Sequence, residues 1–176
     1  ERGAPRSATD FSLTLGGALY IGWLGAYLIS LRELPDGKWW VLLVLPAIWA
    51  ADIAAYFAGK AFGKRPFSPR LSPKKTWEGY LAGIFAAVLV GAALGALWRY
   101  AAGPESDLGW IQGAAIAFAL GALCPIGDLG ISMLKRELNL KDTGSILPGH
   151  GGLLDRIDTW LWAGVLSYYL IVFNPL

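Results

Sequence analysis

The sequence predicts an all-α, polytopic membrane protein with about five transmembrane helices. Of its 176 residues, 55% are hydrophobic and only 16% are charged, whereas an average soluble domain carries about 25% charged residues. The apolar residues form long uncharged runs, and the short polar stretches between them hold nearly all the charge. This distribution excludes a soluble globular enzyme, a disordered tail and a disulfide-stapled secreted module. The net charge of +2 is too small to indicate a nucleic-acid partner.

Five apolar runs account for the predicted spans, since a helix needs about 20 apolar residues to cross the hydrocarbon core. They cover residues 12–31, 39–58, 80–98, 110–134 and 159–173, in a single transmembrane domain over residues 1–176. The fifth run is short unless its helix begins earlier, among residues 155–158. In the fourth run we expect a broken helix near Pro125-Ile-Gly-Asp128, because proline supplies no backbone N–H.

The charges between the spans predict the orientation of the chain, because Lys and Arg are retained on the cytoplasmic side. Residues 59–77 carry six basic residues and no acid, and residues 135–158 carry four basic residues. Residues 32–38 and 99–109 carry at least as many acids as bases. We therefore expect cytoplasmic loops at 59–79 and 135–158, the amino terminus inside and the carboxyl terminus outside.

Two carboxylates, Asp52 and Asp128, fall within the apolar runs. An ionisable group at this depth costs roughly 2.5–3.5 kcal/mol, so it usually serves a function. Asp52 lies near the cytoplasmic end of its span and could instead snorkel or pair with a helix terminus. Asp128 follows a proline and a glycine, and irregular backbone at membrane depth is tolerated only where it lines protein or a wet cavity. We expect a water-filled site that opens to the cytoplasm.

The loop at 135–158 collects groups that bind metal and phosphate. It contains three clustered carboxylates, Asp142, Asp155 and Asp158, and the only histidine, His150, in a Pro-Gly-His-Gly-Gly run. Oxygen ligands suit Mg²⁺, which binds one or two carboxylates together with phosphates and water, whereas no pair of Cys or His favours zinc. The glycines permit the backbone to approach a phosphate closely.

The other basic loop contains Ser72-Pro-Lys74-Lys75-Thr76 at the expected start of a helix. Hydroxyls, ammonium groups and a helix amino terminus are suitable partners for a polyphosphate. Alone, such a run more often fixes topology or attracts anionic lipid. The two loops together place cations and metal-binding carboxylates on one membrane face, as phosphoryl or nucleotidyl transfer to a lipid phosphate requires.

Small residues inside the spans predict close helix packing. Gly-x-x-x-Gly motifs begin at Gly79, Gly91 and Gly109, and such motifs let helix backbones approach one another. We expect these motifs to pack helices within the subunit rather than to form a dimer face. Cys124 is expected to be a buried small hydrophobe.

The longest motif resembles a known signature. Residues 132–158 read Ser-x-Leu-Lys-Arg-x₄-Lys-Asp-x-Gly-x₂-Leu-Pro-x-His-Gly-Gly-Leu-x-Asp-Arg-Ile-Asp, which resembles the signature of phosphatidate cytidylyltransferase, also called CDP-diacylglycerol synthase. Residues 71–79 and 52–64 are also similar to segments of this family. The resemblance implies a nucleotidyltransferase of phospholipid biosynthesis that converts CTP and phosphatidate into CDP-diacylglycerol and pyrophosphate. Family members are longer, so we expect this chain to be the carboxyl-terminal portion of that architecture.

The resemblance also implies roles for individual residues. Asp128 and Asp155 would bind the catalytic Mg²⁺, with a monovalent cation such as K⁺ nearby. The residues expected to bind substrate are Asp52, Ser72, Lys74, Lys75, Thr76, Gly151, Gly152 and Asp158. The residues expected to line the catalytic site are Lys135, Arg136, Lys141, Asp142, His150 and Arg156. His150 could move a proton, or it could hydrogen-bond the loop or a phosphate.

The expected partners are CTP, phosphatidic acid, the lipid bilayer and a second copy of the chain in a homodimer. The expected location is the cell (inner) membrane, with the active site on the cytoplasmic side. A related membrane enzyme or lipid kinase acting on an ether lipid or a polyprenol is the nearest alternative. A lipid or ion transporter would predict repeats or polar faces along several spans, which the sequence lacks. A passive lipid-binding scaffold would not need three clustered carboxylates.

Overall fold

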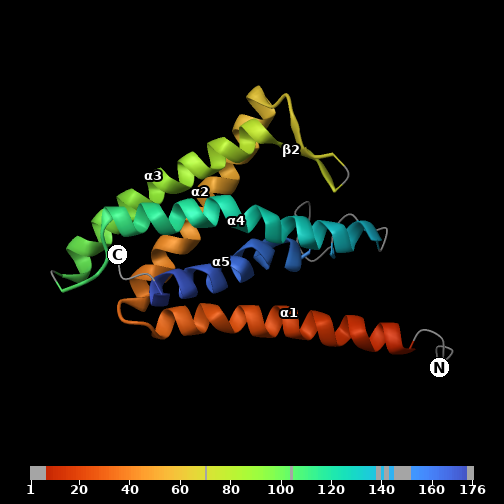
Figure 1. The fold of residues 1–176 in the computed structure, drawn as a ribbon, viewed down its shortest axis with the longest axis horizontal. Coiled ribbons are helices and arrows are strands. Elements are labelled where there is room, and N and C mark those ends of the chain that lie inside the picture. Colours follow the sequence, from red (N-terminus) through yellow and green to blue (C-terminus); the bar gives the residue numbers. More distant parts are fainter. Residues whose placement is uncertain are drawn as a thin grey trace.

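The computed structural model describes residues 7–69, 71–103, 105–137, 140, 143–144 and 152–173. At five of these positions it describes the backbone alone: Pro73, Leu134, Glu137, Asp155 and Arg156. The described residues form five helices and one short β-hairpin (Figure 1). The prediction of a polytopic, all-α membrane protein is therefore confirmed.

Four helices are long and apolar enough to cross a membrane. They are α1 (Ser7–Glu33), α2 (Gly37–Phe62), α3 (Trp77–Ala102) and α4 (Trp110–Glu137). Each contains one of the first four predicted spans and extends beyond it at one or both ends. The apolar runs thus predicted where the helices lie. They did not predict where the helices end, because each helix continues into polar residues outside its apolar run.

The fifth helix, α5 (Leu154–Phe173), begins among the polar residues before the fifth apolar run. Its apolar part, Ile157–Phe173, is shorter than those of the other helices. The whole helix has 20 residues and is about 30 Å long at about 1.5 Å per residue. This length matches the hydrocarbon core only if the polar first turn is included.

The helices run up and down, so that the hairpin between α2 and α3 lies at the same end of the bundle as the connection from α4 to α5. Figure 1 shows the α1–α2 and α3–α4 connections at one end, where α5 also finishes. The hairpin, the end of α4 and the start of α5 lie at the opposite end. The described parts of the two segments that the charge pattern assigned to a common membrane face are therefore on a common side of the fold.

Glycines let α3 approach both of its neighbours. A methyl group on Gly91 would lie 2.5 Å from the carbonyl oxygen of Gly113 on α4, and Gly95 lies in the same seam against Gly109. Gly79 instead faces the backbone of α2, where an added methyl group would lie 2.6 Å from a carbonyl oxygen. All three Gly-x-x-x-Gly motifs thus pack helices within the subunit, as predicted.

The buried core lies mainly among α2, α4 and α5. Leu43 and Val44 of α2 pack with Leu120 and Cys124 of α4, and each of these side chains is nearly or fully buried. The burial of Cys124 agrees with its expected role as a small hydrophobe. By contrast, Leu31 is the one buried residue of α1 among its 27. The exposed apolar side chains of α1 are suited to lipid, which solvates them without cost.

The predicted break in the fourth span is wrong, because α4 is a single helix that continues through Pro125. A proline inside a helix removes one backbone donor, here the one for the carbonyl of Gly121. Helices in membranes tolerate this loss when neighbouring groups supply donors to the affected turn. The hydroxyl of Tyr80 on α3 donates to the carbonyl oxygen of Ala122 at 2.8 Å. Asp128 therefore projects from a helical turn rather than from an unwound segment.

The segment between α2 and α3, predicted as a loop, contains a hairpin. Strand β1 (Pro66–Ser68) pairs antiparallel with β2 (Ser72–Thr76). Trp77 N donates to the carbonyl oxygen of Arg65 at 3.0 Å and closes the base of the hairpin. Strand β1 has only three residues, and β2 (Ser-Pro-Lys-Lys-Thr) contains no apolar residue that alternates with polar ones, so neither shows the pattern by which strands are predicted from sequence.

Two side chains at the start of α3 hold the hairpin on the helix. Thr76 is the N-cap, and its hydroxyl oxygen accepts from Gly79 N at 3.2 Å. The carboxylate of Glu78 accepts from the backbone N–H groups of Lys64 and Arg65, at 3.1 and 3.3 Å. Because these bonds tie both ends of the hairpin to one helical turn, the side chains of β2 have defined positions relative to α3.

Candidate active site

A cavity of about 620 Å³ lies at the end of the bundle that carries the hairpin. Its wall is formed by α2, the hairpin, the first turns of α3, the middle of α4 and the start of α5. Five charged side chains line it: Asp52, Lys60, Lys74, Lys75 and Asp128. Most of the remaining wall is apolar, which lowers the local dielectric and strengthens interactions among these charges.

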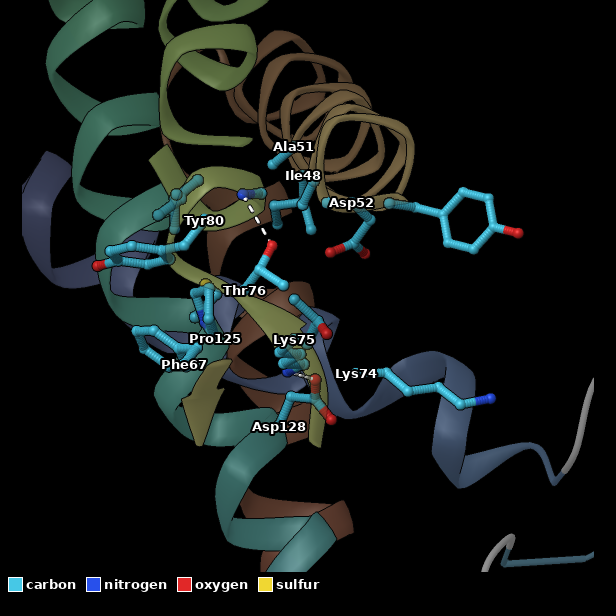
Figure 2. Close-up of a pocket in the computed structure, with 18 of the residues that line it drawn as sticks. Ile48, Ala51, Asp52, Phe67, Lys74, Lys75, Thr76, Tyr80, Pro125 and Asp128 are labelled. Carbon is cyan, nitrogen blue, oxygen red and sulfur yellow. Dashed lines mark hydrogen bonds and ion pairs between the residues drawn. The ribbon is translucent and has the colours of Figure 1, made fainter. Parts of the chain in front are cut away.

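Lys75 and Asp128 form an ion pair in this cavity, drawn as a dashed line in Figure 2. Lys75 comes from β2, and Asp128 comes from α4, 53 residues later. The two side chains are 33% and 28% exposed, so both groups border the cavity instead of being sealed in the core. The pair thus joins the basic motif of the first loop to the intramembrane carboxylate of α4.

Asp52, Lys74 and Thr76 surround this ion pair. Figure 2 shows the carboxylate of Asp52 directed from α2 toward the hairpin, and Lys74 extended away from Asp128. Thr76 accepts a hydrogen bond from Gly79 N in its capping role, which leaves its hydroxyl proton available as a donor. The structure therefore brings four of the residues predicted to bind substrate to one cavity that also contains Asp128.

A second carboxylate lies close to Asp128 at the start of α5. Asp158 is buried, and its Oδ1 accepts from the backbone N–H and the hydroxyl of Thr159, at 2.6 and 3.2 Å. Asp128 and Lys135 are near enough for their charges to act on Asp158. Asp158 is not part of the cavity wall, whereas its neighbour Thr159 is. On α4, the hydroxyl of Ser132 lies 3.5 Å from Asp128 Oδ1.

Three other predicted residues lie away from the cavity wall. Ser72 is paired with Ser68 in the hairpin, and Arg136 is exposed in the last turn of α4. Gly152 packs on Gly144, so that a methyl group on Gly152 would lie 2.7 Å from Gly144 N. This contact brings the described ends of the predicted phosphate-binding loop together.

The remaining predicted residues fall outside the described part of the chain. These are Lys141, Asp142, His150 and Gly151, together with the side chains of Asp155 and Arg156. Their roles, including the pairing of Asp155 with Asp128 at a metal, stay predictions.

Several cavity residues were not predicted from the sequence to belong to the site: Tyr56, Phe67, Tyr80, Cys124 and Thr159. Two of them carried a usable signal, because residues four apart share a helix face. Cys124 is four residues before Asp128, and Tyr56 is four residues after Asp52. Phe67 carried no comparable signal, since its position depends on the hairpin.

The arrangement suits the binding of a polyphosphate with a divalent cation. The cavity offers ammonium groups for phosphate oxygens, and the partly exposed carboxylate of Asp128 could ligate a metal ion. Within the described residues, no group of three or more His, Cys, Asp or Glu side chains forms a metal cage. A single partly exposed carboxylate such as Asp128 is compatible with Mg²⁺, which is commonly bound through one or two carboxylates, substrate phosphates and water.

Comparisons with known proteins agree with this chemistry. Residues 3–174 match the model of the cytidylyltransferase family. The chain is 38% identical over 201 residues to a protein of Synechocystis sp. named phosphatidate cytidylyltransferase, covering 96% of this chain and 65% of that protein. Proteins with the same name from Bacillus subtilis and Brucella suis are 38% and 40% identical, covering 88% and 86% of this chain and 55% and 54% of their own lengths. The chain thus spans between about half and two thirds of these relatives.

Proposed function

The chain belongs to the cytidylyltransferase family, and from this membership we propose that it transfers the cytidylyl group of CTP to phosphatidate. The products would be CDP-diacylglycerol and pyrophosphate. The relatives in Synechocystis sp. and Bacillus subtilis are named for this activity. The single observation that supports the proposal best is the cavity shared by Lys74, Lys75 and Asp128.

The proposed reaction requires two anionic substrates to lie side by side. An oxygen of the lipid phosphate attacks the α-phosphorus of CTP, the bond from this phosphorus to the oxygen bridging to the β-phosphate breaks, and pyrophosphate leaves with that oxygen. The lipid phosphate is already anionic, so no protein nucleophile is needed. Fixed cations that face the developing charge are the main source of stabilisation in such transfers.

Lys74 and Lys75 are suited to hold the phosphates of CTP. Lys75 is paired with Asp128, but both side chains are partly exposed, so the ammonium group can exchange the carboxylate for a phosphate oxygen as the nucleotide enters. Lys74 extends from the same strand at the cavity edge. The hydroxyl of Thr76 can donate to a phosphate while its oxygen remains the cap of α3.

Asp128 is the residue that we propose to hold Mg²⁺, with Asp155 as its second carboxylate by the resemblance. When bound, Mg²⁺ would neutralise phosphate charge and so lower the repulsion between the two substrates. Ser132 lies one turn further along α4 and can orient Asp128 from its Oδ1 side. A second, monovalent cation such as K⁺ is part of the same proposal.

The proposal places the protein in the cell membrane with the cavity facing the cytoplasm. Its support is the excess of basic residues in 59–77 and 135–158, since such residues stay on the cytoplasmic side. A homodimer, also proposed, would use a surface other than the Gly-x-x-x-Gly motifs, because these motifs contact helices of the same subunit.

The test is a transfer assay with purified protein in lipid vesicles. Labelled CTP and Mg²⁺ are supplied with phosphatidic acid, an ether-lipid phosphate or a polyprenyl phosphate, and the Bacillus subtilis relative serves as the positive control. We expect labelled CDP-lipid with phosphatidic acid, and its loss in Asp128→Asn with the protein still folded. The absence of product with all three acceptors would refute the enzyme assignment, and product from another acceptor alone would refute phosphatidate as the substrate.

A further inference from the structure

Two contacts from residues 75–80 reach α4 on opposite sides of Pro125. Lys75 pairs with Asp128, which follows the proline, and Tyr80 donates from its hydroxyl to the carbonyl oxygen of Ala122, which precedes it, at 2.8 Å. The two acceptor positions are about 9 Å apart along the helix, at about 1.5 Å per residue. Strand β2 and the start of α3 are therefore attached to α4 on the two sides of the proline.

The backbone around Pro125 needs such support. Proline has no N–H for the carbonyl four residues earlier, and its ring crowds the preceding turn. The carbonyl left without a helical donor is that of Gly121, and an additional hydrogen bond to the neighbouring carbonyl of the same turn limits the resulting distortion. The hydroxyl of Tyr80 is the side-chain donor that the described residues provide to this turn.

The ring of Tyr80 is itself held in place. It packs on Phe67 of β1, with ring centroids 4.9 Å apart, and on Trp77 at 5.7 Å. Figure 2 shows Tyr80, Phe67 and Pro125 together on the α4 side of the cavity. The hydroxyl thus transmits the position of the hairpin to the helix that carries Asp128.

The two attachments differ in what happens to them when substrate enters. In the proposed function, Lys75 leaves Asp128 for a phosphate, and the ion pair no longer fixes α4. The bond from Tyr80 ends on the backbone carbonyl of Ala122, which is not part of the cavity wall, so substrate is not expected to compete for it. From this difference we propose that Tyr80 is a positioning residue that holds the helical turn at Pro125, and with it the carboxylate of Asp128, in place for the reaction. This inference rests on the proposed function.

The test compares Tyr80→Phe with Tyr100→Phe on the same helix. The first variant loses the hydroxyl and keeps the ring packing, whereas Tyr100 is 91% exposed and serves as the matched control. We expect Tyr80→Phe to lower kcat about tenfold, equivalent to about 1.4 kcal/mol, to raise the Mg²⁺ concentration for half-maximal rate about fivefold, and to leave KM for CTP within twofold. Unchanged kcat and Mg²⁺ dependence would overturn the inference.

A double-mutant cycle separates this role from a general packing effect. Pro125→Ala restores the backbone N–H that bonds the carbonyl of Gly121 and so stiffens the turn that Tyr80 contacts at Ala122. In that background the hydroxyl of Tyr80 should matter less, and Tyr80→Phe should lower kcat less than threefold. Coupling of this kind is expected only for groups that act on the same element. An undiminished tenfold loss in the Pro125→Ala background would contradict the proposed link through the proline turn.

Hydrogen exchange gives a readout that does not require turnover. Amides 126–130 should exchange at least tenfold faster in Tyr80→Phe than in the wild type or in Tyr100→Phe. Equal exchange would overturn the positioning role. Should the wild type make no CDP-lipid, the proposed function fails, yet the exchange result still decides whether Tyr80 supports the turn that carries Asp128.

Discussion

Replacing Lys75 by methionine separates the structural role of this side chain from its proposed role in phosphate binding. The Lys75–Asp128 pair is 33% and 28% exposed, which makes it comparable to surface ion pairs that contribute about 0.2–1 kcal/mol. In a protein of this size, about 1 kcal/mol shifts Tm by about 2–4 °C. We therefore expect Lys75→Met to lower Tm by no more than about 4 °C.

The expected loss of activity in Lys75→Met is much larger than this change in stability. A hydrogen bond to a charged group is worth about 1.5–3 kcal/mol, and about 1.4 kcal/mol corresponds to a tenfold change in rate. If Lys75 holds a phosphate of CTP, kcat/KM for CTP should fall about 10- to 150-fold, mainly through KM. The assay measures initial rates against CTP concentration in vesicles with saturating phosphatidic acid. Thermal unfolding of each variant is measured in the same vesicles.

Lys64→Met is the matched control for this experiment. Lys64 belongs to the same basic segment, is exposed and is not part of the cavity wall. Its structural contact is a backbone hydrogen bond to Glu78, which the substitution leaves intact. Equal losses of kcat/KM in both variants would show that the segment acts only through its net charge. A large fall in Tm with unchanged kcat/KM in Lys75→Met would show that the ion pair is purely structural.

Two further predictions concern packing and orientation. Gly91→Leu should lower Tm by several degrees, since its Cβ would lie 2.5 Å from a carbonyl oxygen of α4 and overpacking costs about 1–3 kcal/mol. Gly22→Leu should leave Tm unchanged, because no atom lies within 4 Å of that Cβ position; equal shifts would contradict the helix seam. Labelling with an impermeant maleimide tests the orientation, and the native Cys124 should not react because it is buried. We expect Lys64→Cys to be labelled only in inverted vesicles and Tyr100→Cys only in intact cells. Labelling of both variants from one side would refute the topology.

The helices were predictable because the bilayer imposes one strong constraint, a run of about 20 apolar residues for each crossing. The ends of the helices were less predictable, since caps and polar turns continue each helix beyond its apolar run. Pro125 shows why the continuity of α4 was missed. A proline indicates a missing donor, but the sequence does not reveal that Tyr80, 42 residues away from Ala122, supplies a donor to the same turn.

The site was predictable in its chemistry but not in its geometry. Lys75 and Asp128 were identified separately, as a cation beside a helix start and as a carboxylate at membrane depth, and both border the cavity. Their direct pairing depends on how the hairpin folds against α4. Tyr80 and Thr159 complete the wall but lie in segments where aromatic and small residues are common, so their residue types carried no distinct signal.

The most direct test of the central claim is to follow the α- and γ-phosphates of CTP separately. Nucleotidyl transfer to phosphatidate breaks the bond between the α-phosphorus and the bridging oxygen. We therefore predict that label from α-phosphate-labelled CTP enters the lipid, while label from γ-phosphate-labelled CTP appears only in pyrophosphate, and that neither transfer occurs in Asp128→Asn. Label from the γ-phosphate in the lipid would identify a kinase instead, and the absence of lipid label from either nucleotide would contradict the proposed reaction altogether.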